Sequence, residues 1–192
     1  MKPKPALLSP LIRSDVQGLM LSKLFLNAGL EFSITELAEF AFTSVPTAMR
    51  EVDRLVEAEY VLDKSLGRVR LIQANQANPL FYPIFQIVAH SYGPATALPA
   101  ALKNLFGLQA AYIHGDWAAR LMQIPGPIPA EVGLILVGNM NRIEAGRLLA
   151  QAESVIGKPI NVQFASNFDW DKAGTEYLAR VKNGPLIELQ ID

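Results

Sequence analysis

The stretch that decides the fold is ITELAEFAFTSVPTAMREVDRLVEAEYV at residues 34–61, followed by LDKSLGRVRLI at residues 62–72. Two short helical patterns in it are separated by Thr43–Pro46, and Pro46 is typical of the first turn of a helix. In the second helix, Val45, Met49, Val52 and Val56 recur at helical spacing and are expected to form the buried stripe.

The polar residues of the same helix define its other side. Thr47, Arg50 and Arg54 are spaced at i, i+3 and i+7, so we expect them to share one exposed face. A β-hairpin is predicted next, with strands over residues 60–64 and 68–72 and a turn over residues 65–67. In its second strand, Val69 and Leu71 alternate with Arg68 and Arg70, which predicts one basic side.

The residues before this stretch predict one more helix. Ser14 and Asp15 are good N-cap candidates for a helix that runs to about Asn27 and is closed by Gly29. The following helix is expected to begin near Ser33 or Thr35. Three short helices and a basic hairpin, in this order, are typical of a winged helix-turn-helix, whose third helix enters the major groove of DNA.

The quoted stretch resembles the ArsR-like branch of winged-helix transcriptional regulators. The resemblance implies that Thr47 and Arg50 approach base edges and that Ser44 and Arg54 contact bases or phosphates. It also implies that the hairpin cations Lys64, Arg68 and Arg70 lie along the DNA backbone or the minor groove. A winged helix that binds protein, or that has only a packing role, is the alternative.

The middle of the chain predicts a connector. Residues 79–90 form an expected helix that is apolar almost all round, and a shorter helix carries Leu98, Ala101, Leu102 and Leu105 on one side. The excess apolar surface suggests a homodimer, which would match a palindromic operator. A helix packed between two domains explains the pattern equally well.

The C-terminal half alternates strands and helices, which predicts a mixed α/β domain. The expected elements are strands over residues 110–114, 133–137, 159–165 and 186–191, and helices over residues 141–156 and 169–182. The fold class is therefore α+β. The predicted domains are a winged helix-turn-helix at residues 1–78, a helical connector at 79–104 and the α/β domain at 105–192.

The order strand, HGDWAAR, loop, AEVGLILVG, helix, GKPINVQFA in residues 105–192 resembles the minimal nucleotidyltransferase fold. That family uses a Gly-Ser turn to cradle phosphates, and paired Asp residues on the next strand to hold divalent metal. Here Gly115 keeps the glycine, but Asp116 stands in place of the serine. The paired Asp positions fall on Glu131 and Gly133, and the later strand offers only Asn161 and Gln163.

These substitutions remove the anionic oxygens that two-metal phosphoryl transfer needs. We therefore expect a catalytically inactive domain, with no catalytic residue, no metal and no cofactor. Gly115, Asp116, Glu131 and Gly133 would form a degenerate nucleotide site. Such a domain could sense an effector, either a small molecule or a nucleotide, or could serve as a dimerisation scaffold.

Two further polar residues are interpreted as structural rather than functional. His114 is expected to be a hydrogen-bonded strand-end histidine rather than a ligand contact, and Asp169 is expected to cap a helix rather than to act in catalysis. The chain has no cysteine and no apolar run near the ~20 residues needed to span a bilayer; its 17 Lys and Arg nearly balance its 18 Asp and Glu. We expect a cytoplasmic protein without a membrane partner.

The leading hypothesis is a DNA-binding transcriptional regulator that acts on double-stranded DNA as a homodimer. Two alternatives remain open. One is an active nucleotidyltransferase whose winged helix recruits a target. The other is an antitoxin-like module that binds another protein chain through its second domain.

Overall fold

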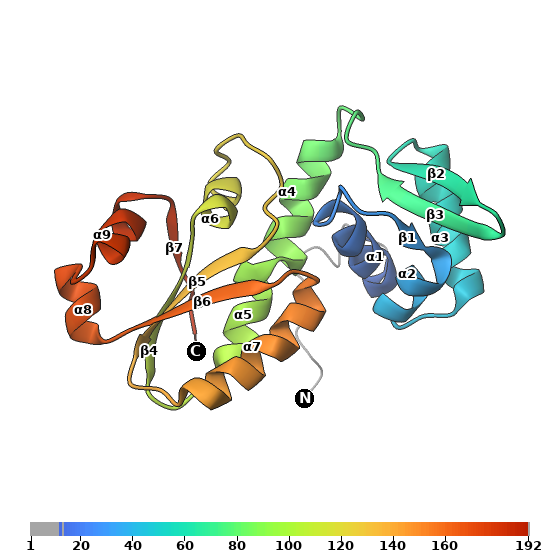
Figure 1. Cartoon of the computed structure of the whole chain (residues 1–192). Helices are drawn as coiled ribbons and strands as arrows, with labels where there is room; N and C mark the ends of the chain where they lie inside the picture. Colours follow the sequence, from blue (N-terminus) through green and yellow to red (C-terminus); the bar gives the residue numbers. More distant parts are fainter. Residues whose placement is uncertain (1–11, 13, 192) are drawn as a thin grey trace. The chain divides into compact units, whose positions relative to one another are not determined.

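The computed structural model describes residue 12 and residues 14–191 (Figure 1). The chain is a mixed α+β protein with two separate β-sheets. It divides into two compact units, residues 1–93 and residues 94–192. The division falls inside the predicted connector, because its first helix belongs to the first unit and its second helix to the second unit.

The N-terminal unit contains four helices and three strands among its described residues. In chain order these are α1 (Asp15–Phe25), β1 (Phe32–Ser33), α2 (Ile34–Phe40), α3 (Val45–Glu57), β2 (Val61–Leu66), β3 (Val69–Ala74) and α4 (Phe81–Tyr92).

The starts of α1 and α2 follow from their sequence. The hydroxyl of Ser14 accepts a hydrogen bond from the backbone N–H of Gln17 and so caps α1, as predicted. The hydroxyl of Ser33 caps α2, and the side chain of Glu36 accepts in return from the backbone N–H of Ser33. This reciprocal pair satisfies two donors that a helix start would otherwise leave open.

The three strands of this unit form an antiparallel sheet in the order β1-β3-β2. Leu66 pairs with Val69, so the turn of the hairpin is Gly67–Arg68 rather than the predicted residues 65–67. Gly67 has φ +61°, a backbone conformation that is costly for residues with a Cβ atom. Helices α1 and α4 pack against each other, and the rings of Phe25 and Phe81 stack at 5.4 Å between centroids.

The C-terminal unit alternates helices and strands over its described residues. They are α5 (Pro94–Leu102), β4 (Leu108–His114), α6 (Asp116–Leu121), β5 (Val132–Gly138), α7 (Arg142–Ile156), β6 (Ile160–Ala165), α8 (Asn167–Lys172), α9 (Glu176–Asn183) and β7 (Leu186–Glu188).

The sheet of this unit has the strand order β6-β5-β4-β7, in which β5 and β6 are parallel and the other pairs are antiparallel. Side chains alternate between its two faces. Tyr112, Ile135 and Gln163 are in register and share one face, while Ile113 and Leu134 lie on the other. Helices α5 and α7 pack against each other, as Figure 1 shows.

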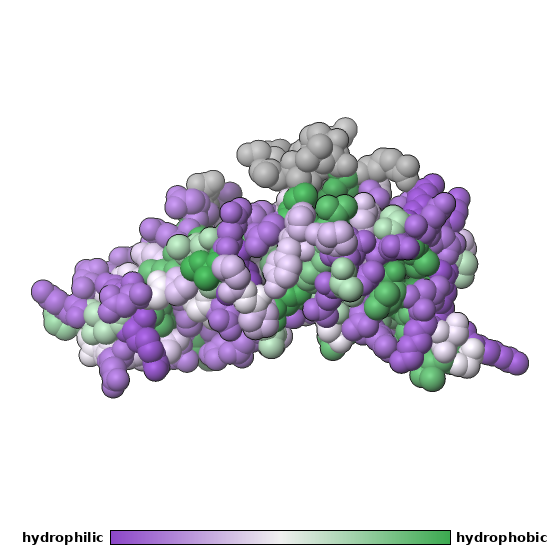
Figure 2. All heavy atoms as spheres, turned by 90° about the horizontal axis from the view of Figure 1, so that it is seen from above, coloured by the Kyte–Doolittle hydropathy of each residue, from purple (hydrophilic) through white to green (hydrophobic). Residues whose placement is uncertain are grey.

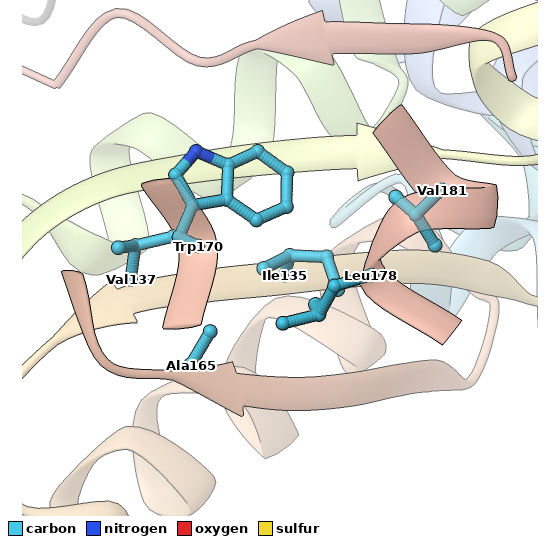
Figure 3. Close-up of a cluster of buried hydrophobic side chains, with 6 residues drawn as sticks. All are labelled: Ile135, Val137, Ala165, Trp170, Leu178 and Val181. Atoms are coloured by element: carbon cyan, nitrogen blue, oxygen red, sulfur yellow. The ribbon is translucent and has the colours of Figure 1, made fainter. Parts of the chain in front are cut away.

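Helices α8 and α9 cover part of the first face. Six buried side chains from two strands and these two helices form one core cluster, which Figure 3 shows: Ile135, Val137, Ala165, Trp170, Leu178 and Val181. The rings of Tyr112 and Trp170 stack with centroids 4.5 Å apart at its border.

Several predicted boundaries need correction. The predicted helix over residues 169–182 is two helices, because Ala173 and Gly174 end α8 and the hydroxyl of Thr175 caps α9. The last strand stops at Glu188 rather than at residue 191. In the part of the chain that the structure describes, no helix has the length and apolarity to cross a membrane.

Candidate functional sites

The start of α3 presents short polar side chains and a cation. The hydroxyl of Ser44 accepts from the backbone N–H of Thr47 at 3.4 Å and lies 3.0 Å from the Thr47 hydroxyl. Arg50 is exposed, and its guanidinium donates to the Thr47 hydroxyl at 3.4 Å. No acidic residue lies in the first turn of α3. The positive end of the helix dipole is therefore not neutralised by a side chain at this point.

The buried side of α3 differs from the prediction. Ala48, Val52 and Leu55 are buried, whereas Val45 and Met49 are 40% and 43% exposed. The buried stripe is therefore centred on residues 48, 52 and 55, not on the predicted Val45–Met49–Val52–Val56 series. Small Ala48 contacts the core, and this turns the two larger apolar residues at the start of the helix toward solvent.

The second half of α3 is acidic as well as basic. The guanidinium of Arg54 donates to Glu51 at 2.7 Å, so its charge is balanced on its own helix. Arg54 is exposed, as predicted. Asp53 and Glu57 are also exposed on this half. The only cation of this half is therefore balanced by a carboxylate, which leaves the first half of α3 as the part better suited to a negatively charged partner.

The hairpin cations have different environments. Arg70 donates to Asp53 of α3 at 2.6 Å and to Asp63 of β2 at 2.7 Å, and its side chain is only 28% exposed. The hydrogen bond to Asp53 is the largest of the effects that raise its pKa. Arg70 therefore connects the hairpin to α3, which corrects the prediction that it forms part of an outward basic side.

Lys64 and Arg68 remain outward. The ammonium of Lys64 lies 3.3 Å from a carboxylate oxygen of Glu31, and both side chains are exposed. An exposed ion pair of this kind contributes little to stability. Arg68 lies in the turn of the hairpin and is exposed, without a hydrogen bond or ion pair among the described residues. The neighbouring Val69 is exposed as well, so the predicted inward side of β3 is wrong, and Ile72 and Ala74 form it instead.

The residues of the predicted degenerate nucleotide site lie at one end of the second sheet. Gly115 follows β4 with φ +70°, and Asp116 begins α6. Glu131 precedes β5, and Gly133 pairs with His114 on one side and Asn161 on the other. The structure thus brings the four predicted residues to the same region.

His114 is a partly buried polar group of this region. Its ring lies against the Cα atom of Gly133, where an added Cβ atom would be 2.7 Å from the ring. Its Nε2 lies 3.3 Å from the hydroxyl of Tyr177, so the predicted hydrogen bond is confirmed. Burial lowers the pKa of His114 below its ordinary value, and Glu131 opposes this effect. The neutral imidazole is therefore favoured.

The chemistry available here is hydrogen bonding. The Asn161 amide donates to Glu131 at 3.3 Å. A cleft of about 320 Å³ lies nearby and includes Tyr177, Gln163, Thr175 and Asp169 in its lining. Within residues 12 and 14–191, no three His, Asp or Glu side chains are grouped so that they could hold a metal ion.

Sequence reasoning missed one residue of this region, Tyr177, and the contact between Asn161 and Glu131. Tyr177 reaches His114 from α9, which is 63 positions away in the chain, and no local pattern signals that contact. The Asn161–Glu131 contact depends on the parallel pairing of β5 and β6. Asp169 accepts from the Ser166 hydroxyl and lies in the first turn of α8, as predicted, but the residue that caps the helix is Ser166.

Comparison of this chain with protein-family models, with curated proteins and with solved structures finds no match.

Proposed function

We propose that this protein is a transcriptional regulator whose N-terminal unit binds double-stranded DNA with the first half of α3 and the turn of the β2–β3 hairpin. The observation that carries the proposal is that Arg50 and Arg68 are both exposed and have no carboxylate partner among the described residues. The order of helices and strands in this unit, α1-β1-α2-α3-β2-β3, agrees with the order expected for a winged helix-turn-helix and supports the same proposal.

The proposed set of DNA-contacting residues is smaller than the set that the sequence suggested. Ser44, Thr47 and Arg50 would face base edges in the major groove, and Lys64 and Arg68 would face phosphates. Lys64 can exchange its exposed contact with Glu31 for a phosphate at low cost. Arg54 would reach DNA only by leaving Glu51, and Arg70 only by releasing two carboxylates, so we assign Arg70 no DNA contact.

Duplexes selected from a random library by the full chain test this proposal, with the affinity then measured over a series of salt concentrations. Arg50→Ala is expected to cost about 1–3 kcal/mol on the selected duplex and to relax sequence preference. Arg68→Ala is expected to weaken all sequences alike and to lower the salt slope by about one. Arg147→Ala, an exposed arginine on α7, makes the same charge change and serves as the control.

The proposal fails if both Arg50→Ala and Arg68→Ala bind as the unchanged protein does, or if no duplex is enriched above random sequence. A loss that is equal for Arg147→Ala would also contradict it, because that result would show an effect of net charge rather than a defined contact.

We propose further that the protein acts as a homodimer through α1 and α4. Leu80, Tyr82 and Ile87 of this region are each about half exposed, and an apolar cleft of about 360 Å³ lies beside them, lined by Leu21 and Ile84 among others. Ile87→Glu is expected to shift the sedimenting species toward the monomer. Ile143→Glu, at an 87% exposed position on α7, is the control and should leave the species unchanged.

For the C-terminal unit we propose a nucleotidyltransferase-like domain without catalysis, which senses a ligand or supports the dimer. The support is the residue set: Gly133 offers no metal ligand where the family has an aspartate, and Asn161 is neutral. Full-length protein incubated with Mg²⁺ and each of the four nucleoside triphosphates is expected to release no pyrophosphate. Turnover that disappears in Glu131→Ala would instead favour the enzyme.

A further inference from the structure

Three apolar side chains are exposed around the start of α3. Phe42, in the turn before the helix, is 90% exposed, and Val45 and Met49 follow at 40% and 43%. Phe42 also has φ +50°, a strained backbone conformation for a residue with a Cβ atom. Val45 and Met49 are four residues apart, so they lie next to each other on one side of the helix.

Single exposed apolar residues are ordinary on protein surfaces, and Figure 2 shows apolar residues in green scattered among polar ones in purple. Val45 and Met49 differ from these in their position. They lie at the part of α3 that carries Ser44, Thr47 and Arg50, and no acid lies in the first turn beside them. A partner large enough to cover this end of α3 would therefore meet Arg50 as well as Val45 and Met49.

The charge of Arg50 distinguishes between the partners that could cover this surface. An apolar surface of another protein, or of a second copy, would cover Val45 and Met49 but would leave Arg50 desolvated without an anion. The major groove of DNA offers both kinds of group, because phosphates and guanine acceptors suit Arg50 and the 5-methyl group of thymine is apolar. Double-stranded DNA is therefore the occupant that matches the whole surface.

We infer that Val45 and Met49 contact thymine 5-methyl groups and so determine part of the sequence that the protein prefers. This inference rests on the proposed function and adds to it the base that the apolar side of α3 recognises. It predicts that the preferred duplex contains thymine at one or two fixed positions next to the base that Arg50 contacts.

The test uses the full chain and the selected duplex. Each thymine is replaced in turn by uracil, which pairs identically but lacks the methyl group. At one or two positions the affinity is expected to fall about fourfold, which is the effect of removing one buried methyl group. In Met49→Ala or Val45→Ala, the protein should bind thymine and uracil equally at the matching position.

Matched variants keep the result interpretable. Alanine is a good helix former and both positions are exposed, so these variants should fold as the unchanged protein does, which circular dichroism checks. Val56→Ala alters a partly exposed valine in the second half of the same helix and should keep the thymine preference.

Three outcomes would overturn the inference. If the unchanged protein binds its duplex specifically but no uracil substitution weakens it, the inference fails while the proposed function stands. If no duplex is bound specifically, both fail. If Met49→Ala weakens self-association but leaves the thymine preference intact, the apolar side of α3 is an interface between two copies.

Discussion

At the scale of single residues, Gly133 and His114 share a space that only one side chain can fill. An added Cβ atom at residue 133 would lie 2.7 Å from the His114 ring, which is also held by the Tyr177 hydroxyl. Gly133→Ala is therefore expected to lower the free energy of unfolding of the C-terminal unit by about 1–3 kcal/mol. Urea unfolding followed by tryptophan fluorescence measures it, since Trp117 and Trp170 both lie in this unit.

The same pair supplies its own control. When His114 is first replaced by alanine, the space beside residue 133 is empty, and the further change Gly133→Ala should cost much less. If the two costs are equal, the strain lies in the backbone of β5 rather than in the contact with the ring.

His114 also predicts a dependence of stability on pH. Burial lowers its pKa in the folded chain below the ordinary value of 6.5, so the unfolded chain binds a proton first as pH falls. The unfolded state then holds more protons, and the free energy of unfolding decreases from about pH 6.5 downward until the folded-state pKa is passed. His114→Phe, which keeps a ring at this position, should show a smaller decrease between pH 7 and pH 5. Equal decreases in the two proteins would contradict this prediction.

At the scale of elements, Arg70 links the hairpin to α3. Its two charge-assisted hydrogen bonds to Asp53 and Asp63 are partly shielded from water. Arg70→Gln is expected to destabilise the hairpin by about 1 kcal/mol, seen as roughly fivefold faster hydrogen exchange of the β2 and β3 amides. Lys64→Gln removes the exposed contact with Glu31 and should change exchange less than twofold. Similar rates in both variants would show that Arg70 does not brace the hairpin.

The helices show which structural features could be predicted from local sequence patterns. Caps at Ser14 and Ser33 could be predicted, because each depends on contacts within four residues. The buried side of α3 could not, since the pattern of large apolar residues points to Val45 and Met49 while the core is contacted by the small Ala48.

The break between α8 and α9 had a local signal, Gly174 followed by the capping residue Thr175, which the continuous helical pattern concealed. In the candidate sites, the predicted exposure of Arg50 is confirmed, and Gly115 and Gly133 lie at the same end of the second sheet. The pairing of Arg70 with Asp53, and of His114 with Tyr177, is set by the tertiary fold, so local spacing carried no information about it.

At the scale of the whole molecule, each unit has its own buried core. Ile135, Trp170 and Leu178 belong to one cluster of the C-terminal unit, and Phe25 and Phe85 are fully buried in the N-terminal unit. Separate cores favour separate unfolding transitions. Because both tryptophans lie in the second unit, tryptophan fluorescence reports that unit alone, whereas hydrogen exchange of the hairpin amides reports the first.

Two variants on different units test this independence. Gly146 lies on the exposed side of α7 with no atom within 4 Å of an added Cβ atom, so Gly146→Ala should stabilise the helix by about 0.5–1 kcal/mol. Gly146→Ala is expected to move the fluorescence transition to higher urea and to leave hairpin exchange unchanged. Arg70→Gln is expected to speed hairpin exchange and to leave the fluorescence transition unchanged. In the double variant, both effects should appear at full size. If Arg70→Gln moved the fluorescence transition, the two units would unfold as one, because loss of a contact in the first would then reach the core of the second.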